Sequence, residues 1–323
     1  MNFISNFGNV TCQGVTGRSK EEEKELRDSY EVKMSVKNAY NAEMKKKNYY
    51  RLVSGRPADG AKEGWRRNEW LEETGYFLLD WDYFEKGKDG QLTKKKLDWK
   101  AVWDKMKKHT KEWGIVHAEK SARHGLHVTV IRTAGLTIEE NIRLMELRTD
   151  VDVDFDHACK DIARACFLVP NDYVIFEDDM YYSDEKPTPL PLFKADWEML
   201  ERDKEERRIA HEKMIEERRK SAPELHYGGL TDEVSQLQLV VDLIIKQRID
   251  ITYEYDNWIR IGFCISNYLG SAGEDIFHEI SRLYPRYEWK ETHRIYENLV
   301  KTTRHEVSLG SLIHLARLEG VMK

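Results

Sequence analysis

Two carboxylates alternate within the apolar run Leu78-Leu79-Asp80-Trp81-Asp82-Tyr83-Phe84. This composition is typical of a buried strand, on which side chains two residues apart lie on the same face, about 6.6 Å apart. We therefore expect Asp80 and Asp82 to converge on one spot. Because buried carboxylates are unfavourable without compensation, the pair indicates a cation, and oxygen ligands favour Mg²⁺ or Mn²⁺. The alternative is a sheet edge at which both acids are solvated or paired with arginines.

A second polar segment leads into another predicted strand. Residues 121–128 read Ser-Ala-Arg-His-Gly-Leu-His-Val, which places His127 just inside that strand. Gly125 has no Cβ and would let the backbone come close to a phosphate, to which Arg123 and His127 could donate hydrogen bonds. The alternative is a strand histidine satisfied by its protein neighbours, which is the commoner role.

An acidic segment supplies a third group of candidates. Residues 152–164 read Asp-Val-Asp-Phe-Asp-His-Ala-Cys-Lys-Asp-Ile-Ala-Arg. A helical turn after Asp156 would bring the guanidinium of Arg164 beside this carboxylate. A solvated acidic loop is the alternative interpretation of such a run.

The elements that would position these residues follow a βαββα order. Asp98 is predicted to cap a helix over 98–112, and Thr137 with Glu140 forms the capping box of a second helix. Further elements are strands at 114–119 and 126–131 and a helix or helical turn at 157–167. The pattern predicts an α+β domain in which helices pack against a small sheet.

The chain has 323 residues, which is enough for two domains with separate cores. We expect an α+β domain over residues 1–190, a charged helical linker over 191–228 and a separate all-α domain over 229–323. Mixed-sign charges at helical spacing over 197–220 suit an exposed helix. Apolar stripes within the last domain predict amphipathic helices, which cover 234–245, 258–269 and 276–283.

Composition limits the class of protein. Hydrophobic residues make up 40% of the chain and charged residues 34%, as in a folded protein with an ionic surface. No apolar run approaches a membrane span, the first residues do not resemble a signal peptide, and the four cysteines lack zinc-binding or disulfide spacing. We therefore expect a cytoplasmic protein.

The net charge of −6 does not by itself indicate a nucleic-acid-binding protein. However, basic clusters between residues 45 and 111 are interleaved with tyrosines and tryptophans. Phosphate attraction combined with aromatic stacking is how proteins hold single strands. The alternative is that these lysines belong to solvated helix faces.

The three candidate segments, in this order, resemble the archaeo-eukaryotic primase superfamily. Within it, residues 1–180 are similar to the bacterial primase-polymerase domains called VirE N-terminal domains, which occur in mobile elements. The most specific stretch is Asp156-x-x-Cys159-Lys160-Asp161-Ile162-x-Arg164-Ala165-Cys166-Phe167. Residues 250–263 and 277–281 resemble the helical primase C-terminal domain that follows such catalytic domains.

The resemblance implies an RRM-like catalytic domain with DNA primase and DNA polymerase activity, from a protein encoded by a bacterium, phage or plasmid. Three carboxylates would be catalytic and would hold two Mg²⁺ or Mn²⁺ ions: Asp80, Asp82 and Asp156. The side chains implied to contact the incoming nucleotide are His127 and Arg164, with Arg123, Ser121 and Lys120 as weaker candidates. The implied partners are a single-stranded DNA template, a primer strand, NTPs or dNTPs and a separate helicase, with no membrane.

One position departs from the family pattern. Relatives generally read Ser-Gly-x-Gly-x-His before the second strand, whereas this chain has Arg123 in place of the first glycine. The replacement puts the backbone geometry of the phosphate loop in question. Arg123 could instead contact phosphate itself.

Two other functions fit parts of the pattern. A rolling-circle nicking endonuclease would need a histidine pair and a nucleophilic tyrosine, but His124 and His127 would point to opposite faces of a strand. A non-catalytic, nucleic-acid-binding replication adaptor could be built on a decayed polymerase fold. The three intact carboxylates argue against that second alternative.

Overall fold

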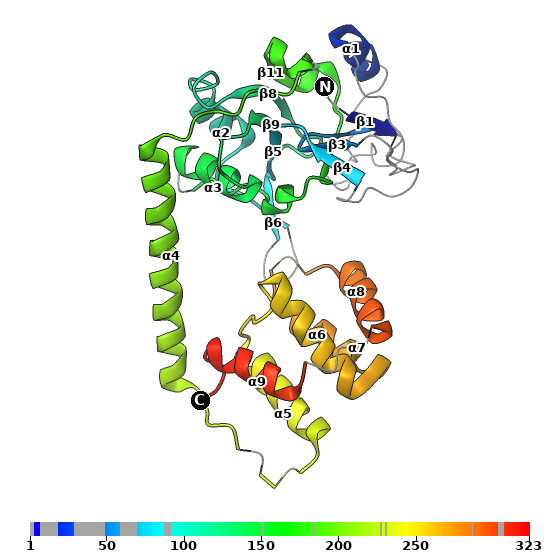
Figure 1. Cartoon of the computed structure of the whole chain (residues 1–323), viewed down its shortest axis with the longest axis vertical. Helices are drawn as coiled ribbons and strands as arrows, with labels where there is room; N and C mark the ends of the chain where they lie inside the picture. Colours follow the sequence, from blue (N-terminus) through cyan, green and yellow to red (C-terminus); the bar gives the residue numbers. More distant parts are fainter. Residues whose placement is uncertain are drawn as a thin grey trace. The chain divides into compact units, whose positions relative to one another are not determined.

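The structure is a computed structural model that describes residues 3–6, 19–28, 49–58, 70–86, 92–149, 152–183, 185–226, 228–229, 231–285, 287–302 and 307–323. The chain divides into two compact units, Met1–Asp203 and Lys204–Lys323 (Figure 1). The first unit mixes helices and strands, whereas the regular elements described in the second are all helical. The expected α+β class with a helical C-terminal region is therefore confirmed, while the boundaries at 190 and 228 stay predictions.

A four-stranded antiparallel sheet forms the centre of the first unit. Its strands lie in the order β11 (Val174–Glu177), β8 (Ile115–Lys120), β9 (Leu126–Ile131) and β5 (Tyr76–Trp81). The ranges of β8 and β9 agree with the sequence prediction to within one residue. The strand predicted around the two aspartates ends earlier than expected, so that Asp82 lies beyond it.

The register of this sheet decides which side chains share a face. Asp80 on β5 is paired with His127 on β9, and His127 is paired in turn with Glu119 on β8. Because directly paired residues point to the same side, these three polar side chains lie on one face. The adjacent pair Leu79 and Val128 therefore points to the other face, where both residues are completely buried.

Two helices share the core of this sheet, α2 (Trp99–Met106) and α3 (Ile138–Thr149). The cap of α2 is confirmed, because the carboxylate of Asp98 accepts a 2.8 Å hydrogen bond from the amide of Ala101. The helix is shorter than predicted, since residues after Met106 form turns. Each fully buried aliphatic side chain in such a core contributes about 1.5–3 kcal/mol.

The capping box of α3 is also confirmed. The amide of Thr137 donates a 2.8 Å hydrogen bond to Glu140 Oε2, and the amide of Glu140 donates a 3.2 Å bond to Thr137 Oγ1. This box satisfies two amides at the start of the helix, so that α3 begins where the sequence indicated.

The segment predicted as a helix or helical turn over 157–167 divides into two parts. His157–Lys160 forms one 3-10 turn, which supports the helical-turn alternative, but Ala165–Phe167 forms strand β10. β10 pairs with β2 (Tyr49–Leu52), which also pairs with β1 (Phe3–Asn6). Pairing with a distant strand thus overrides any local helical preference. The unit also contains helix α1 (Lys20–Asp28) and two 3-10 turns, Asn171–Tyr173 and Asp179–Tyr182. Two further antiparallel strand pairs are β3 (Gly55–Pro57) with β4 (Leu71–Glu73) and β6 (Phe84–Lys86) with β7 (Leu92–Lys94).

The exposed charged helix predicted over 197–220 is confirmed as α4 (Lys194–Ser221). Arg208 pairs with Glu205 and Glu212 along its surface, which is the stabilisation expected for mixed-sign charges at helical spacing. No helix among the described residues is long and apolar enough to cross a bilayer.

The second unit is built from amphipathic helices around one apolar core. The three predicted stripes form helices, and Gly270, with a φ of 55°, follows the last residue of the second. A Cβ at Gly262 would come within 2.4 Å of Leu299, so this glycine lets two helices pack closely. The helices are α5 (Glu233–Gln247), α6 (Tyr255–Leu269), α7 (Glu274–Ser281), α8 (Trp289–Lys301) and α9 (Leu309–Leu318).

Candidate active site

Two of the three predicted carboxylates converge near the end of β5. The amide of Asp156 donates a 2.7 Å hydrogen bond to the backbone carbonyl of Asp80, which attaches the segment after α3 to the sheet. One oxygen of each carboxylate and the sulfur of Cys159 lie within 4.8 Å of one another. Oδ1 of Asp80 is buried and has no hydrogen-bond partner among the described residues. A buried orphan oxygen beside a second carboxylate fits a bound cation.

Asp156 is held in position by its own neighbours. It caps the 3-10 turn, with Oδ1 accepting a 3.0 Å hydrogen bond from the amide of Ala158, and Oδ2 accepts a 2.9 Å bond from Arg164. The predicted contact between Asp156 and Arg164 is therefore present, although Arg164 lies just before β10 rather than on a helix. Because each carboxylate oxygen has two lone pairs, these bonds are compatible with metal ligation.

The third carboxylate does not join this group. Asp82 follows the last residue of β5 and is exposed, so the alternation expected from a longer strand fails at this position. The charge of Asp82 nevertheless affects Asp80. Burial raises the pKa of Asp80 to about 6, and the positive charge of His127 opposes this rise. The negative charges of Asp82 and Asp156 add to it. The cationic neighbours of Asp80 thus compensate its ionised form only in part, which leaves it less favourable than a free carboxylate and suited to a bound cation.

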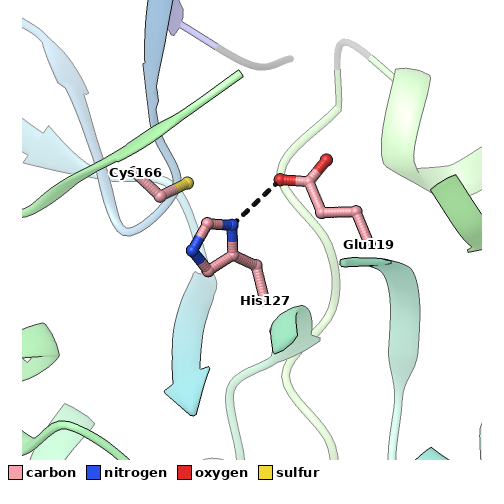
Figure 2. A group of neighbouring side chains, drawn as sticks. All are labelled: Glu119, His127 and Cys166. Atoms are coloured by element: carbon pink, nitrogen blue, oxygen red, sulfur yellow. Dashed lines mark hydrogen bonds and ion pairs between the residues drawn. The ribbon is translucent and has the colours of Figure 1, made fainter. Parts of the chain in front are cut away.

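His127 connects Asp80 with a second buried acid. Its Nε2 lies 3.6 Å from Oδ1 of Asp80, and its Nδ1 lies 3.2 Å from Oε1 of Glu119 (Figure 2). Burial alone would lower the pKa of His127, but the charge of Asp80 and the hydrogen bond to Glu119 outweigh it and raise that pKa. The imidazole is therefore oriented at both nitrogens and favours its charged form beside Asp80.

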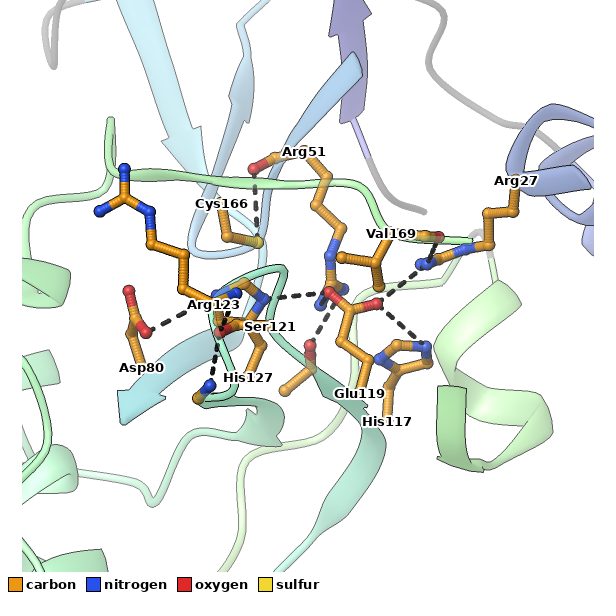
Figure 3. A network of polar contacts seen from close by, with 12 residues as sticks. Arg27, Arg51, Asp80, His117, Glu119, Ser121, Arg123, His127, Cys166 and Val169 are labelled. Atoms are coloured by element: carbon orange, nitrogen blue, oxygen red, sulfur yellow. Dashed lines mark hydrogen bonds and ion pairs between the residues drawn. The ribbon is translucent and has the colours of Figure 1, made fainter. Parts of the chain in front are cut away.

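Glu119 lies between two buried arginines. Arg27 and Arg51 each place a guanidinium nitrogen 3.0 Å from one of its carboxylate oxygens (Figure 3). Burial by itself would raise the pKa of Glu119, but Arg51 and Arg27 hold it well below its usual range. Glu119, His127 and Cys166 lie close enough to be considered as metal ligands. The two guanidinium groups already neutralise this acid, and they would repel a further cation.

The loop between β8 and β9 is shaped by internal contacts. Oγ of Ser121 accepts a 2.8 Å hydrogen bond from the amide of Gly125 and a longer one from the amide of Arg123. A Cβ at Gly125 would lie 2.3 Å from the carbonyl oxygen of Trp81, so the glycine is needed for the chain's own packing. Arg123 forms no ion pair with any described acid, so its guanidinium is available to a ligand.

Two further residues lie differently from expectation. Lys120 alternates with Glu119 on β8 and so points to the opposite face, where its ammonium lies 4.7 Å from the ring centre of Tyr173. The structure does not bring it to Asp80. His124 has a φ of 67° and lies in the turn before β9, outside the strand predicted over 126–131. Only the comparison with nicking endonucleases had placed it on one strand with His127, and the structure does not.

Sequence reasoning missed the buried charge network behind His127. Arg51 also donates hydrogen bonds to Thr129 and to the hydroxyl of Tyr181, and it is completely buried. One available signal was Glu119 itself, a charged residue that follows the largely apolar run Ile115-Val116-His117-Ala118 within one predicted strand. The arginines could not be assigned to it, because they come from distant segments.

Comparison with known proteins gives one match. Residues 242–316, within the second unit, match the family model described as primase C terminal 2 (PriCT-2). This match supports a primase-type C-terminal domain and a primase-associated role in replication. No curated protein and no solved structure matches the chain.

Proposed function

We propose that the first unit is an RRM-like primase-polymerase domain that transfers nucleotides from NTPs or dNTPs to a 3′-hydroxyl on a single-stranded DNA template. The observation that carries this proposal is the convergence of Asp80 and Asp156, flanked by His127 and Arg164, in a chain whose second unit matches a primase C-terminal family. A separate helicase would supply the single strand.

The donor set fits divalent ions. Asp80 and Asp156 would hold Mg²⁺ or Mn²⁺, with the exposed Asp82 completing the ligands from the end of β5, and Mn²⁺ is the more tolerant of the nearby Cys159. Bound ions supply activation of the attacking hydroxyl and neutralisation of charge on the triphosphate.

The chain's own cations would position the triphosphate. His127, held by Glu119, presents a charged imidazole beside Asp80, and Arg123 extends from the loop before β9. Arg164 is already ordered by Asp156 and is less than half exposed, so it can donate to a phosphate with little loss of side-chain entropy. Ser121 would keep the loop in shape through its hydrogen bonds, whereas a role for Lys120 would require another conformation.

The test is incorporation of labelled nucleotide on primed and unprimed single-stranded DNA in Mg²⁺ or Mn²⁺. We expect the wild type to extend primers and Asp80→Asn to lose at least about a thousandfold in rate, because the ligand that aligns the reacting groups is gone. Asp154→Asn is the matched control, since Asp154 is mostly exposed and pairs only with Lys95 among the described residues.

Each alternative has its own outcome in the same assay. Strand binding without incorporation under any metal would contradict the proposal and favour the non-catalytic adaptor. A covalent tyrosine–DNA adduct on a single-stranded origin would contradict it in favour of a nicking endonuclease. Equal incorporation by the wild type and Asp80→Asn would also overturn it.

A further inference from the structure

Three side chains of the second unit converge on one point between α7 and α8. Glu274 and His278 are four residues apart on α7 and so lie on the same face of that helix, and His293 belongs to α8. One carboxylate oxygen of Glu274 and one ring nitrogen of each histidine lie within 4.8 Å of one another. Nδ1 of His293 contacts Oε1 of Glu274, and Nε2 of His278 lies 3.5 Å from the same oxygen.

His278 is the buried member of this cluster. Its side chain is only 4% exposed, and its Nε2 has no hydrogen-bond partner among the described residues. The other ring nitrogen, Nδ1, forms a 2.7 Å hydrogen bond with the hydroxyl of Tyr287. A buried ring nitrogen without a hydrogen bond is unfavourable. In a metal-bound histidine one ring nitrogen binds the ion while a hydrogen bond fixes the other, and here Nδ1 is fixed in this way and Nε2 is left for an ion.

Trp289 fixes the orientation of both imidazoles. Its ring centre lies 5.4 Å from that of His278 and 5.0 Å from that of His293, and both pairs are stacked within 11° of parallel. Stacking on one indole restricts rotation of the two rings, so their nitrogens stay directed toward Glu274. The donor atoms are thereby ordered by contacts that need no ion.

We propose that Glu274, His278 and His293 bind a divalent transition-metal ion of the zinc class, which links α7 to α8. Two imidazole nitrogens with one carboxylate oxygen are ligands that zinc uses in three-ligand sites, and solvent takes the remaining position. Bonds of about 2.0–2.1 Å would place the donors about 3.3 Å apart, close to the present Glu274–His278 separation. The distance between Oε1 of Glu274 and Nδ1 of His293 would have to increase slightly for both atoms to bind one ion. Two nitrogen donors do not suit Mg²⁺, so this site differs in chemistry from the one at Asp80.

The experiment compares zinc binding by the full chain and three variants after treatment with a chelator. His293→Gln and Glu274→Gln each remove one donor from a partly exposed position, so the helices should fold. His314→Gln is the matched control, because His314 is an exposed histidine of the same unit outside the cluster. The cysteine- and aspartate-containing groups of the first unit are identical in all four proteins, and differences therefore report on this cluster alone.

We expect the wild type and His314→Gln to bind one zinc ion more than the other two variants, or to bind it at least about a hundredfold more tightly. Zinc should raise the melting temperature of the wild type and His314→Gln more than that of His293→Gln and Glu274→Gln. Co²⁺ should give the visible absorption of a tetrahedral site only in the wild type and His314→Gln. Circular dichroism in chelator checks that all four are folded. Equal stoichiometry and affinity in the wild type and both Gln variants, or no zinc binding by the wild type, would overturn the proposal.

Discussion

The backbone amide of Asp156 donates a 2.7 Å hydrogen bond to the backbone carbonyl of Asp80. Two segments from distant parts of the chain are thus joined directly beside their carboxylates. Because a backbone bond holds them together, the acidic pair is assembled by the fold before any cation binds. The carboxylates then repel each other, which accounts for part of the raised pKa of Asp80.

Removing the buried charge should stabilise the metal-free protein. Folding raises the pKa of Asp80 from 3.8 to about 6, so the ionised carboxylate at pH 7.5 destabilises the folded state by an amount on the order of 3 kcal/mol. We expect Asp80→Asn to raise the melting temperature in chelator at pH 7.5 while abolishing nucleotide incorporation. The gain should shrink as the pH falls below 6 and vanish below pH 3.8, where the wild-type carboxyl is protonated in both the folded and the unfolded state. A lower melting temperature for the variant at pH 7.5 would contradict this.

Removing the negative charge of Glu119, which lies between Arg27 and Arg51, should instead destabilise the protein. Glu119→Gln leaves Arg27 and Arg51 buried with too little negative charge, which should lower the free energy of unfolding by about 3–5 kcal/mol. Glu177→Gln removes a carboxylate paired with surface lysines and should lower it by about 1 kcal/mol or less. Urea denaturation of both variants beside the wild type measures the contrast, and equal losses would refute it.

Glu119 should also make the stability of the fold depend on pH. The folded-state pKa of Glu119 lies well below 4.5, so its contribution to stability is fully present above pH 4.5 and is lost as the pH falls through that lower value. Because Glu119 also raises the pKa of His127, the stability difference between the wild type and Glu119→Gln should not fall between pH 7 and about 5, and it should narrow in more acid solution. Urea denaturation at several pH values follows this difference, and a gap that widens below pH 4.5 would show the sign to be wrong.

Gly125 should tolerate no side chain. A Cβ there would lie 2.3 Å from the carbonyl oxygen of Trp81 and 2.8 Å from Oγ of Ser121, so Gly125→Ala must displace the end of β5. We expect the free energy of unfolding to fall by about 1–3 kcal/mol, because the added methyl group has no room. Nucleotide incorporation should also fall, because Asp80 is next to the displaced Trp81. Gly310→Ala is the control: its Cβ would meet only Ser308, at 3.4 Å, and alanine favours the helix. Activity of Gly125→Ala equal to that of the control would exclude this role of the loop.

Much of the local structure could be predicted from the sequence. The caps at Asp98 and Thr137, the strands β8 and β9 and the helices of the second unit depend on short-range patterns, and the structure agrees with them. The contact between Asp156 and Arg164 was also anticipated, because both residues belong to one short segment.

Features that depend on long-range contacts could not be predicted in this way. The last residue of β5, Trp81, is paired with the first residue of its partner β9, Leu126, so the position of Asp82 depended on a strand 45 residues away in sequence. Likewise, only tertiary packing brings Arg51 and Arg27 to Glu119. A cross-strand pair or a buried ion pair between distant segments leaves no periodic signal in the sequence.

The shared cation site of Asp80 and Asp156 is tested most directly by Mn²⁺ binding, followed by electron paramagnetic resonance at neutral pH. We predict that the wild type and the surface variant Asp154→Asn bind Mn²⁺ alike, and that Asp80→Asn and Asp156→Asn each weaken this binding by at least about tenfold. Binding of equal strength in all four proteins would contradict a site made by these two carboxylates.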